Sequence, residues 1–76
     1  MVHAFVMIKT AAGKSEGLLT SIRTLGPVSD AHIVAGTYDI IAEIDVAEMY
    51  DVLNAVSTEI QGLEGVTDTK TYVAMS

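Results

Sequence analysis

The short stretch of residues 34–39 most constrains what this chain can fold into. It lies at the middle of the 76 residues and separates two apolar runs, 28–34 and 39–46, that are both typical of strands. The four residues between the runs suit a hairpin connection, because Gly36 can adopt a positive φ angle at little cost. The rest of the chain is arranged around this hairpin in two similar halves.

The first half begins with a strand that is apolar at nearly every position from Val2 to Lys9. A strand with one face in water would alternate between apolar and polar residues, so we expect this one to be buried on both faces. The twofold period of a strand places Val2, Ala4, Val6 and Ile8 on one face and His3, Phe5 and Met7 on the other.

Each half then continues into a helix. In the first half Ser15 is the expected N-cap, and Gly26-Pro27 ends an apolar stripe formed by Leu18, Ile22 and Leu25. In the second half Asp45 and Glu48 have the spacing of a capping box, and the helix is expected to end at Gly62. Its apolar face is expected to contain Met49, Val52, Leu53, Val56 and Ile60.

The two remaining strands have clear face patterns. The strand over 39–46 places Ile40, Ala42, Ile44 and Val46 on one face and Ile41, Glu43 and Asp45 on the other. The strand over 66–74 is rich in threonine, with Thr67, Thr69, Thr71 and Val73 on one face. The order strand, helix, strand, hairpin, strand, helix, strand predicts an α+β, ferredoxin-like βαββαβ fold with a four-stranded antiparallel sheet.

One face of this sheet lacks a cover within the chain, because two helices cover only one face of four strands. The uncovered face contains Phe5, Met7 and Ile41. Half of the residues are hydrophobic, which is more apolar surface than so small a body hides alone. We therefore expect a second copy to cover this face, so that folding and dimerisation are coupled.

Charge and composition exclude several classes of function. The formal net charge is −6, and the four cations, Lys9, Lys14, Arg23 and Lys70, form no cluster, which disfavours direct binding to nucleic acid. There is no cysteine, so disulfides, thiolate metal sites and a cysteine nucleophile are excluded. No apolar run is long enough to cross a bilayer and no signal peptide is recognisable, so the expected location is the cytoplasm.

Catalytic and metal-binding motifs are not recognisable. His3 and His32 are the only candidate bases at neutral pH, and neither has a partner at motif spacing. No glycine-rich phosphate loop, paired histidines or calcium loop occurs, so no metal, cofactor or catalytic residue is predicted. Glu43 and Asp45 fit either an acid pair or hard-metal site, or a solvated patch near Lys70 with Asp45 capping the second helix.

Residue types alone do not decide whether the polar residues of the hairpin and of the last strand bind a ligand or have a structural role. Thr67, Thr69 and Thr71 fit either a row of hydroxyls for a ligand or ordinary β-branched strand residues. Gly36 fits a hairpin glycine, and Asp39 fits a turn residue bonded to nearby backbone. Tyr38 is a large amphipathic ring at a loop tip, a position that favours an interface.

Taken together, these residues resemble a known family. The resemblance rests on Val28 and Ala31, on Val34–Asp39 with its Gly-x-Tyr-Asp hairpin, on Leu63-Glu64-Gly65-Val66, and on Thr69 and Thr71. The chain resembles the effector-binding (RAM) domain of the Lrp/AsnC, or feast/famine, transcription regulators, across essentially all of residues 1–76. The usual N-terminal helix-turn-helix is missing, so it looks like a single stand-alone domain that does not itself bind DNA.

The resemblance implies a dimeric α+β barrel whose dimers assemble into tetramers, octamers or rings. It also implies an amino acid bound between dimers, as an effector in amino-acid metabolism or transcription control. The backbone of Gly36, Thr37 and Tyr38 would hold its carboxylate, Asp39 would accept from its ammonium group, and Thr69 and Thr71 would contribute hydroxyl contacts. The output would pass to a full-length relative or to an enzyme.

Two other readings remain open. Small dimeric α+β barrels also serve as monooxygenase-type enzymes, for which His3, His32 and Glu43 would be the candidate residues. The other reading is an interaction module without a small ligand. No convergence of an acid and a base by spacing supports the enzyme, so the expectation is a protein that is not an enzyme.

Overall fold

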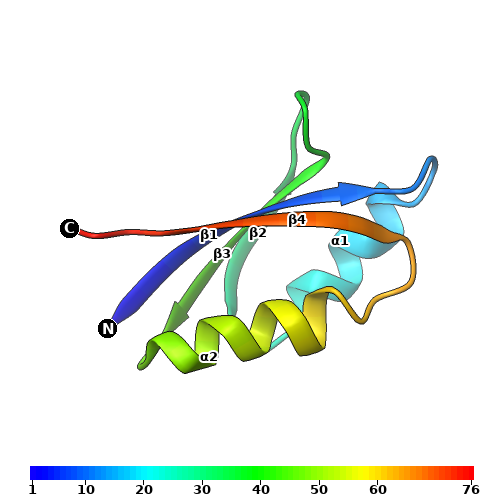
Figure 1. The fold of residues 1–76 in the computed structure, drawn as a ribbon. Coiled ribbons are helices and arrows are strands. Elements are labelled where there is room, and N and C mark those ends of the chain that lie inside the picture. The colour runs from blue at the N-terminus through cyan, green and yellow to red at the C-terminus, as the bar shows by residue number, and fades with distance from the viewer.

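The computed structural model describes residues 1–76 and confirms the predicted order of elements. Figure 1 shows the strands as arrows and the helices as coils. The elements are β1 (Val2–Thr10), α1 (Ser15–Arg23), β2 (Val28–Ile33), β3 (Ile40–Val46), α2 (Met49–Asn54), the π-helix η1 (Ala55–Ile60) and β4 (Val66–Val73). None of the helices has the length and hydrophobicity of a membrane-spanning segment.

The four strands form one antiparallel sheet in the order β2-β3-β1-β4. The central strand β1 pairs with β3 from Val2↔Val46 to Ile8↔Ile40, and with β4 from Ala4↔Val73 to Thr10↔Val66. Each helix leads from an inner strand to an outer one, so the chain folds as two interlocked βαβ units. This confirms the ferredoxin-like α+β fold.

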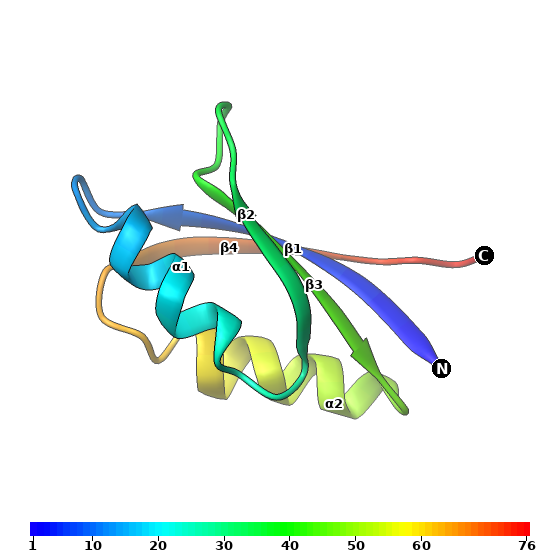
Figure 2. The same ribbon diagram turned by 180° about the vertical axis from the view of Figure 1, so that it is seen from behind.

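Both helices lie on one face of the sheet, as the two opposite views show (Figures 1 and 2). The core between the layers consists of thirteen buried residues, all apolar. The sheet contributes Ala4, Val6, Ile8, Ala31, Ile40, Ala42 and Ile44, which confirms the predicted faces of β1 and β3. The helices contribute Leu18, Ile22, Val52, Ala55, Val56 and Ile60.

The opposite face of the sheet, here named the open face, has no cover within the chain. Its side chains include Phe5, Met7, Lys9, Ile41, Lys70 and Tyr72. Phe5 is 37% exposed and Tyr72 is 54% exposed. In the single chain only the helix side of β1 is buried, and burial of its other face stays a prediction that depends on a second copy.

The second helix departs from the predicted pattern. Met49 and Leu53 are 47% and 61% exposed, so their assignment to the buried face is wrong, whereas Ala55 is buried. The buried face is formed by Val52, Ala55 and Val56, which have the i, i+3, i+4 spacing of one helical face, so Leu53 is turned away from the core. From Ala55 onward the bonding is π-helical, and the Gln61 N–H donates to the carbonyl five residues earlier, at Val56. This spacing places Ala55 and Ile60, which are five residues apart, on the same buried face.

Both predicted helix starts are displaced along the chain. Lys14 is the N-cap of α1 and Ser15 is its first helical residue. The capping box of α2 is formed by Glu48 and Asp51, whose carboxylate accepts from the Glu48 N–H at 3.2 Å. Asp45 does not cap the helix, because β3 continues through it and its side chain binds elsewhere.

The glycines with a positive φ angle are Gly13 and Gly65, and Gly36 is not among them. Gly65 has a φ of 102°, and a Cβ there would lie 3.1 Å from Cδ1 of Leu18. Gly36 does not have a positive φ, so this part of the hairpin prediction is wrong. The hairpin itself is present, and it is closed by the Val34 N–H, which donates to the Asp39 carbonyl at 2.9 Å.

Candidate functional site

The β2–β3 hairpin projects from the sheet on the side away from the helices (Figures 1 and 2). At its base the Asp39 N–H donates to the Ile8 carbonyl at 2.9 Å, and Oδ2 of Asp39 accepts from the Thr10 N–H at 2.8 Å. The other oxygen, Oδ1, accepts no hydrogen bond from the chain. Asp39 is half-buried, so it has a structural role in addition to any role in binding.

The tip of the hairpin is polar and incompletely bonded. Gly36 and Thr37 are exposed and Tyr38 is half-buried. The N–H groups of residues 35–38 donate to no acceptor of the chain, whereas the carbonyl of Thr37 accepts from Nζ of Lys9 at 2.8 Å. Sequence reasoning missed Lys9, although the alternation along β1 places it on the open face below this hairpin.

The predicted threonines lie elsewhere. Thr69 pairs with Ile8 and Thr71 with Val6, so both side chains lie on the helix side of the sheet, at its β4 edge. The hydroxyl of Thr69 accepts from the side-chain amide of Gln61, which follows η1, at 2.7 Å. Thr71 is exposed.

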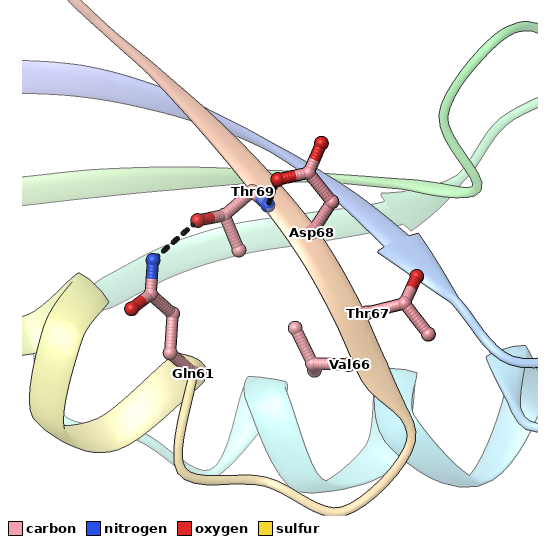
Figure 3. Close-up of a pocket in the computed structure, with 5 residues that line it drawn as sticks. All are labelled: Gln61, Val66, Thr67, Asp68 and Thr69. Atoms are coloured by element: carbon pink, nitrogen blue, oxygen red, sulfur yellow. Dashed lines mark hydrogen bonds between the residues drawn. The ribbon is translucent and has the colours of Figure 1, made fainter.

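A cavity of about 300 Å³ lies beneath this edge of the sheet. Figure 3 shows the side chains of Gln61 and Thr69 pointing toward one another. Five residues line the cavity, Gln61, Val66, Thr67, Asp68 and Thr69, and only Val66 is hydrophobic. Of the predicted site residues only Thr69 belongs to it. Its lining of hydroxyl, amide and carboxylate groups suits a polar ligand group.

The structure therefore does not bring the predicted site residues together within one chain. The residues of the hairpin, Gly36 to Asp39, extend from the side of the open face, whereas Thr69 and Thr71 project from the side that the helices cover. One chain thus holds two separate groups of predicted ligand contacts.

A third polar cluster lies on the open face around His3. Its Nδ1 donates to Oδ1 of Asp45 at 2.5 Å, and its Nε2 lies 3.2 Å from Oε1 of Glu43. The ring also meets Phe5 edge-on, with centroids 4.8 Å apart. The hydrogen bond to Asp45 raises the pKa of His3, and the same bond lowers the pKa of Asp45.

This arrangement corrects the interpretation of Glu43 and Asp45 as a patch near Lys70. Their partner is His3, because β1 pairs directly with β3 and places His3 opposite Asp45, whereas Lys70 lies opposite Met7 on the far side of β1. No group of three or more acidic or histidine side chains is arranged to hold a metal ion.

The residues of the enzyme reading are only partly brought together. His3 contacts Glu43, but His32 is bonded to Asp30 at 2.9 Å on the edge strand β2. That hydrogen bond lowers the pKa of Asp30. Neither His3, His32 nor Glu43 lines a cavity. The second cavity, of about 200 Å³, lies against α1 and includes Gly13, Lys14 and Glu64.

A βαββαβ sheet with one open face, a polar hairpin above it and a polar cavity at its edge defines the class of small α+β ligand-binding domains. Residues 3–76 match the model of the Lrp/AsnC ligand binding domain, so the chain belongs to this family. The match confirms the resemblance found in the sequence. Domains of this family are regulatory, bind small effectors and oligomerise.

Individual relatives agree with this assignment. The chain is 34% identical over 55 residues to the leucine-responsive regulatory protein of Haemophilus influenzae, a match covering 72% of this chain and 33% of that protein. It thus spans about a third of the length of this curated relative. The crystal structure of TTHA0845 from Thermus thermophilus is similar, with 30% identity and a TM-score of 0.96 over 100% of this chain and 95% of that one.

A more distant likeness concerns the fold alone. A transcriptional regulator of Neisseria meningitidis, solved in complex with L-Met, is 18% identical with a TM-score of 0.87. The likeness covers 99% of this chain and 50% of the regulator.

Proposed function

We propose that this domain binds a free amino acid and that binding changes how its copies assemble. Its family supports a small effector, and the names of two similar proteins point to amino acids. One is named a leucine-responsive regulatory protein, and the other was solved in complex with L-Met. In this proposal residues 1–76 act as one effector-binding domain.

The observation that carries the proposal is the set of unused hydrogen-bonding groups at the hairpin. The N–H groups of Gly36, Thr37 and Tyr38 are without acceptors, which suits a carboxylate. Oδ1 of Asp39 is without a donor, which suits an ammonium group. In a free amino acid the carboxylate and the ammonium group are bonded to the same carbon atom. A short hairpin that offers both N–H donors and a carboxylate therefore complements both groups.

The threonine contacts require a second chain in this proposal, because Thr69 and Thr71 lie on the other side of the sheet from the hairpin. Two copies would pair through Phe5, Met7 and Ile41 of the open face, forming a dimeric α+β barrel. The hairpin of one dimer would then meet the β4 edge of a neighbouring dimer, and the amino acid would lie at that seam.

Binding at a seam supplies a regulatory mechanism. A ligand that contacts two dimers stabilises whichever assembly completes its site, so the amino acid shifts the population toward a tetramer, an octamer or a ring. A full-length Lrp/AsnC relative that co-assembles with this chain, or an enzyme of amino-acid metabolism, would receive the signal.

The test is a screen of the twenty common L-amino acids by thermal shift, combined with light scattering to measure molar mass. We expect at least one amino acid to raise the melting temperature and to increase the mass of the assembly. If none of the twenty raises the melting temperature, the binding proposal fails. If one does and the mass stays constant, the assembly part alone fails.

A further inference from the structure

Lys9 is the cation that the fold places at the hairpin. It is the second-last residue of β1, and strand alternation directs it to the open face with Phe5 and Met7. Its Nζ donates to the Thr37 carbonyl at 2.8 Å. An ammonium group has three donors, so this contact leaves two of them unused.

Lys9 forms no ion pair within the chain. All ion pairs with N···O distances up to 4.0 Å involve histidines, so no carboxylate lies that close to Nζ of Lys9. This holds although Asp68 is its register partner in β4 and Asp39 closes the same hairpin. An unpaired ammonium beside free N–H groups attracts an anion more strongly than the N–H groups alone.

The cation and the anion of the hairpin region are attached to consecutive residues. Lys9 holds the Thr37 carbonyl through its side chain, and Thr10 holds the Asp39 carboxylate through its N–H. Both charges are thus anchored at the same end of β1. Their placement complements a zwitterion, in which the carboxylate and the ammonium group are bonded to the same carbon.

From this geometry we infer that the Lys9 ammonium binds the α-carboxylate of the amino acid while it remains bonded to the Thr37 carbonyl. The inference rests on the proposed function and deepens it, since it assigns a cationic contact that backbone N–H groups alone would not supply. The bound amino acid then ties the hairpin tip to β1. The site accepts α-amino acids and discriminates against compounds of the same shape without the negative charge.

The test compares an amino acid with its α-carboxamide, which keeps the shape and the ammonium group but is not anionic. Calorimetry is carried out with the tightest binder among the twenty L-amino acids and with its carboxamide. We expect the wild-type chain to prefer the acid by about tenfold or more, in line with a charge-assisted contact. In Lys9→Gln that preference should fall several-fold because binding of the acid weakens, whereas binding of the carboxamide is unchanged.

Two further variants make the test specific. Lys9→Arg keeps the charge and should retain most of the preference for the acid. Lys70→Gln is the matched control, since Lys70 is a cation on the same open face that does not contact the hairpin. It should leave the preference intact.

The outcomes separate this inference from the proposed function. An undiminished preference for the acid in Lys9→Gln, or equal binding of acid and carboxamide by the wild-type chain, overturns the role of Lys9 and leaves amino-acid binding standing. Absence of binding by all twenty amino acids overturns both. Because Lys9 is exposed, its variants are expected to fold, which circular dichroism at the working concentration verifies.

Discussion

Asp39 combines a structural contact with a free acceptor, and two substitutions separate these roles. Asp39→Asn keeps an oxygen that accepts from the Thr10 N–H but removes the charge that faces the ligand ammonium. We expect amino-acid affinity to fall by roughly tenfold to a hundredfold without a large loss of stability. Calorimetry measures the affinity and urea unfolding measures the stability.

Asp39→Ala should weaken binding to a similar degree. In addition it leaves the Thr10 N–H without its acceptor, and we expect a loss of about 1 kcal/mol in the free energy of unfolding. Wild-type affinity in Asp39→Asn would remove Asp39 from the site.

The His3–Asp45 pair makes stability depend on pH. The pKa of His3 is raised above 6.5, so its contribution is fully present below pH 6.5 and is lost as the pH rises through the folded-state pKa. The pKa of Asp45 is lowered from 3.8, so its contribution is present above pH 3.8 and is lost as the pH falls through the folded-state pKa. The pair therefore stabilises the fold most between about pH 4 and pH 6.5.

We expect the wild-type chain to lose stability as the pH rises above 6.5 and through the raised pKa of His3, and His3→Gln to show a flatter profile over the same range. Urea unfolding at a series of pH values and constant protein concentration measures this difference. His32→Gln is the control, because His32 is bonded to Asp30 on the edge strand and not to Asp45. Parallel profiles for the wild-type chain and His3→Gln would contradict the assignment.

At the scale of elements, strand patterns were more predictive than helix patterns. The faces of β1 and β3 followed from alternation, because successive side chains of a strand point to opposite faces of the sheet. The face of the second helix was predicted incorrectly at Met49 and Leu53. No sequence signal marked the π-helical segment over Ala55–Ile60, which places Ala55 and Ile60 on the same buried face.

For the candidate site, the sequence allowed prediction of the local motifs but not of the tertiary contacts. The Gly-x-Tyr-Asp and Thr-x-Thr segments were recognisable because their residue types and spacing are local. The contacts of Lys9 with Thr37 and of Gln61 with Thr69 were not, since each joins residues that tertiary packing alone brings together. The separation of hairpin and threonines to two sides of the sheet likewise needed the three-dimensional arrangement.

For β4 we predict that Thr69→Val weakens amino-acid binding without weakening the fold. Valine keeps the β-branched shape and removes the hydroxyl that accepts from Gln61. Because this bond is exposed, we expect the free energy of unfolding to change by no more than about 0.5 kcal/mol. Calorimetry should show several-fold lower affinity, and unchanged affinity would exclude the Thr69 hydroxyl from the site.

At the scale of the whole molecule, the open face determines whether the chain is a monomer or an oligomer. Burial of a large apolar side chain contributes about 1.5 to 3 kcal/mol, so pairing over Phe5, Met7 and Ile41 would contribute as much as the stability of a small domain. We therefore expect sedimentation velocity to show a dimer or a larger species at micromolar concentration.

Ile41→Lys should dissociate that species, because it places a charge at the centre of the open face, opposite Met7. Ile33→Lys is the matched control, since Ile33 pairs with Ile40 and lies on the other face of the same sheet. A folded wild-type monomer at micromolar concentration would contradict the assembly, as would equal dissociation of the two variants.

The purely apolar core has a consequence for how proteins of this kind diversify. No polar or charged side chain is buried, so no ionisable group is required to hold the layers together. Surface charges can therefore change one at a time without leaving an unpaired charge in the interior. Evolution or protein engineering can therefore change, through surface substitutions, which effector and which partner subunit the chain binds, while the same core continues to specify the fold.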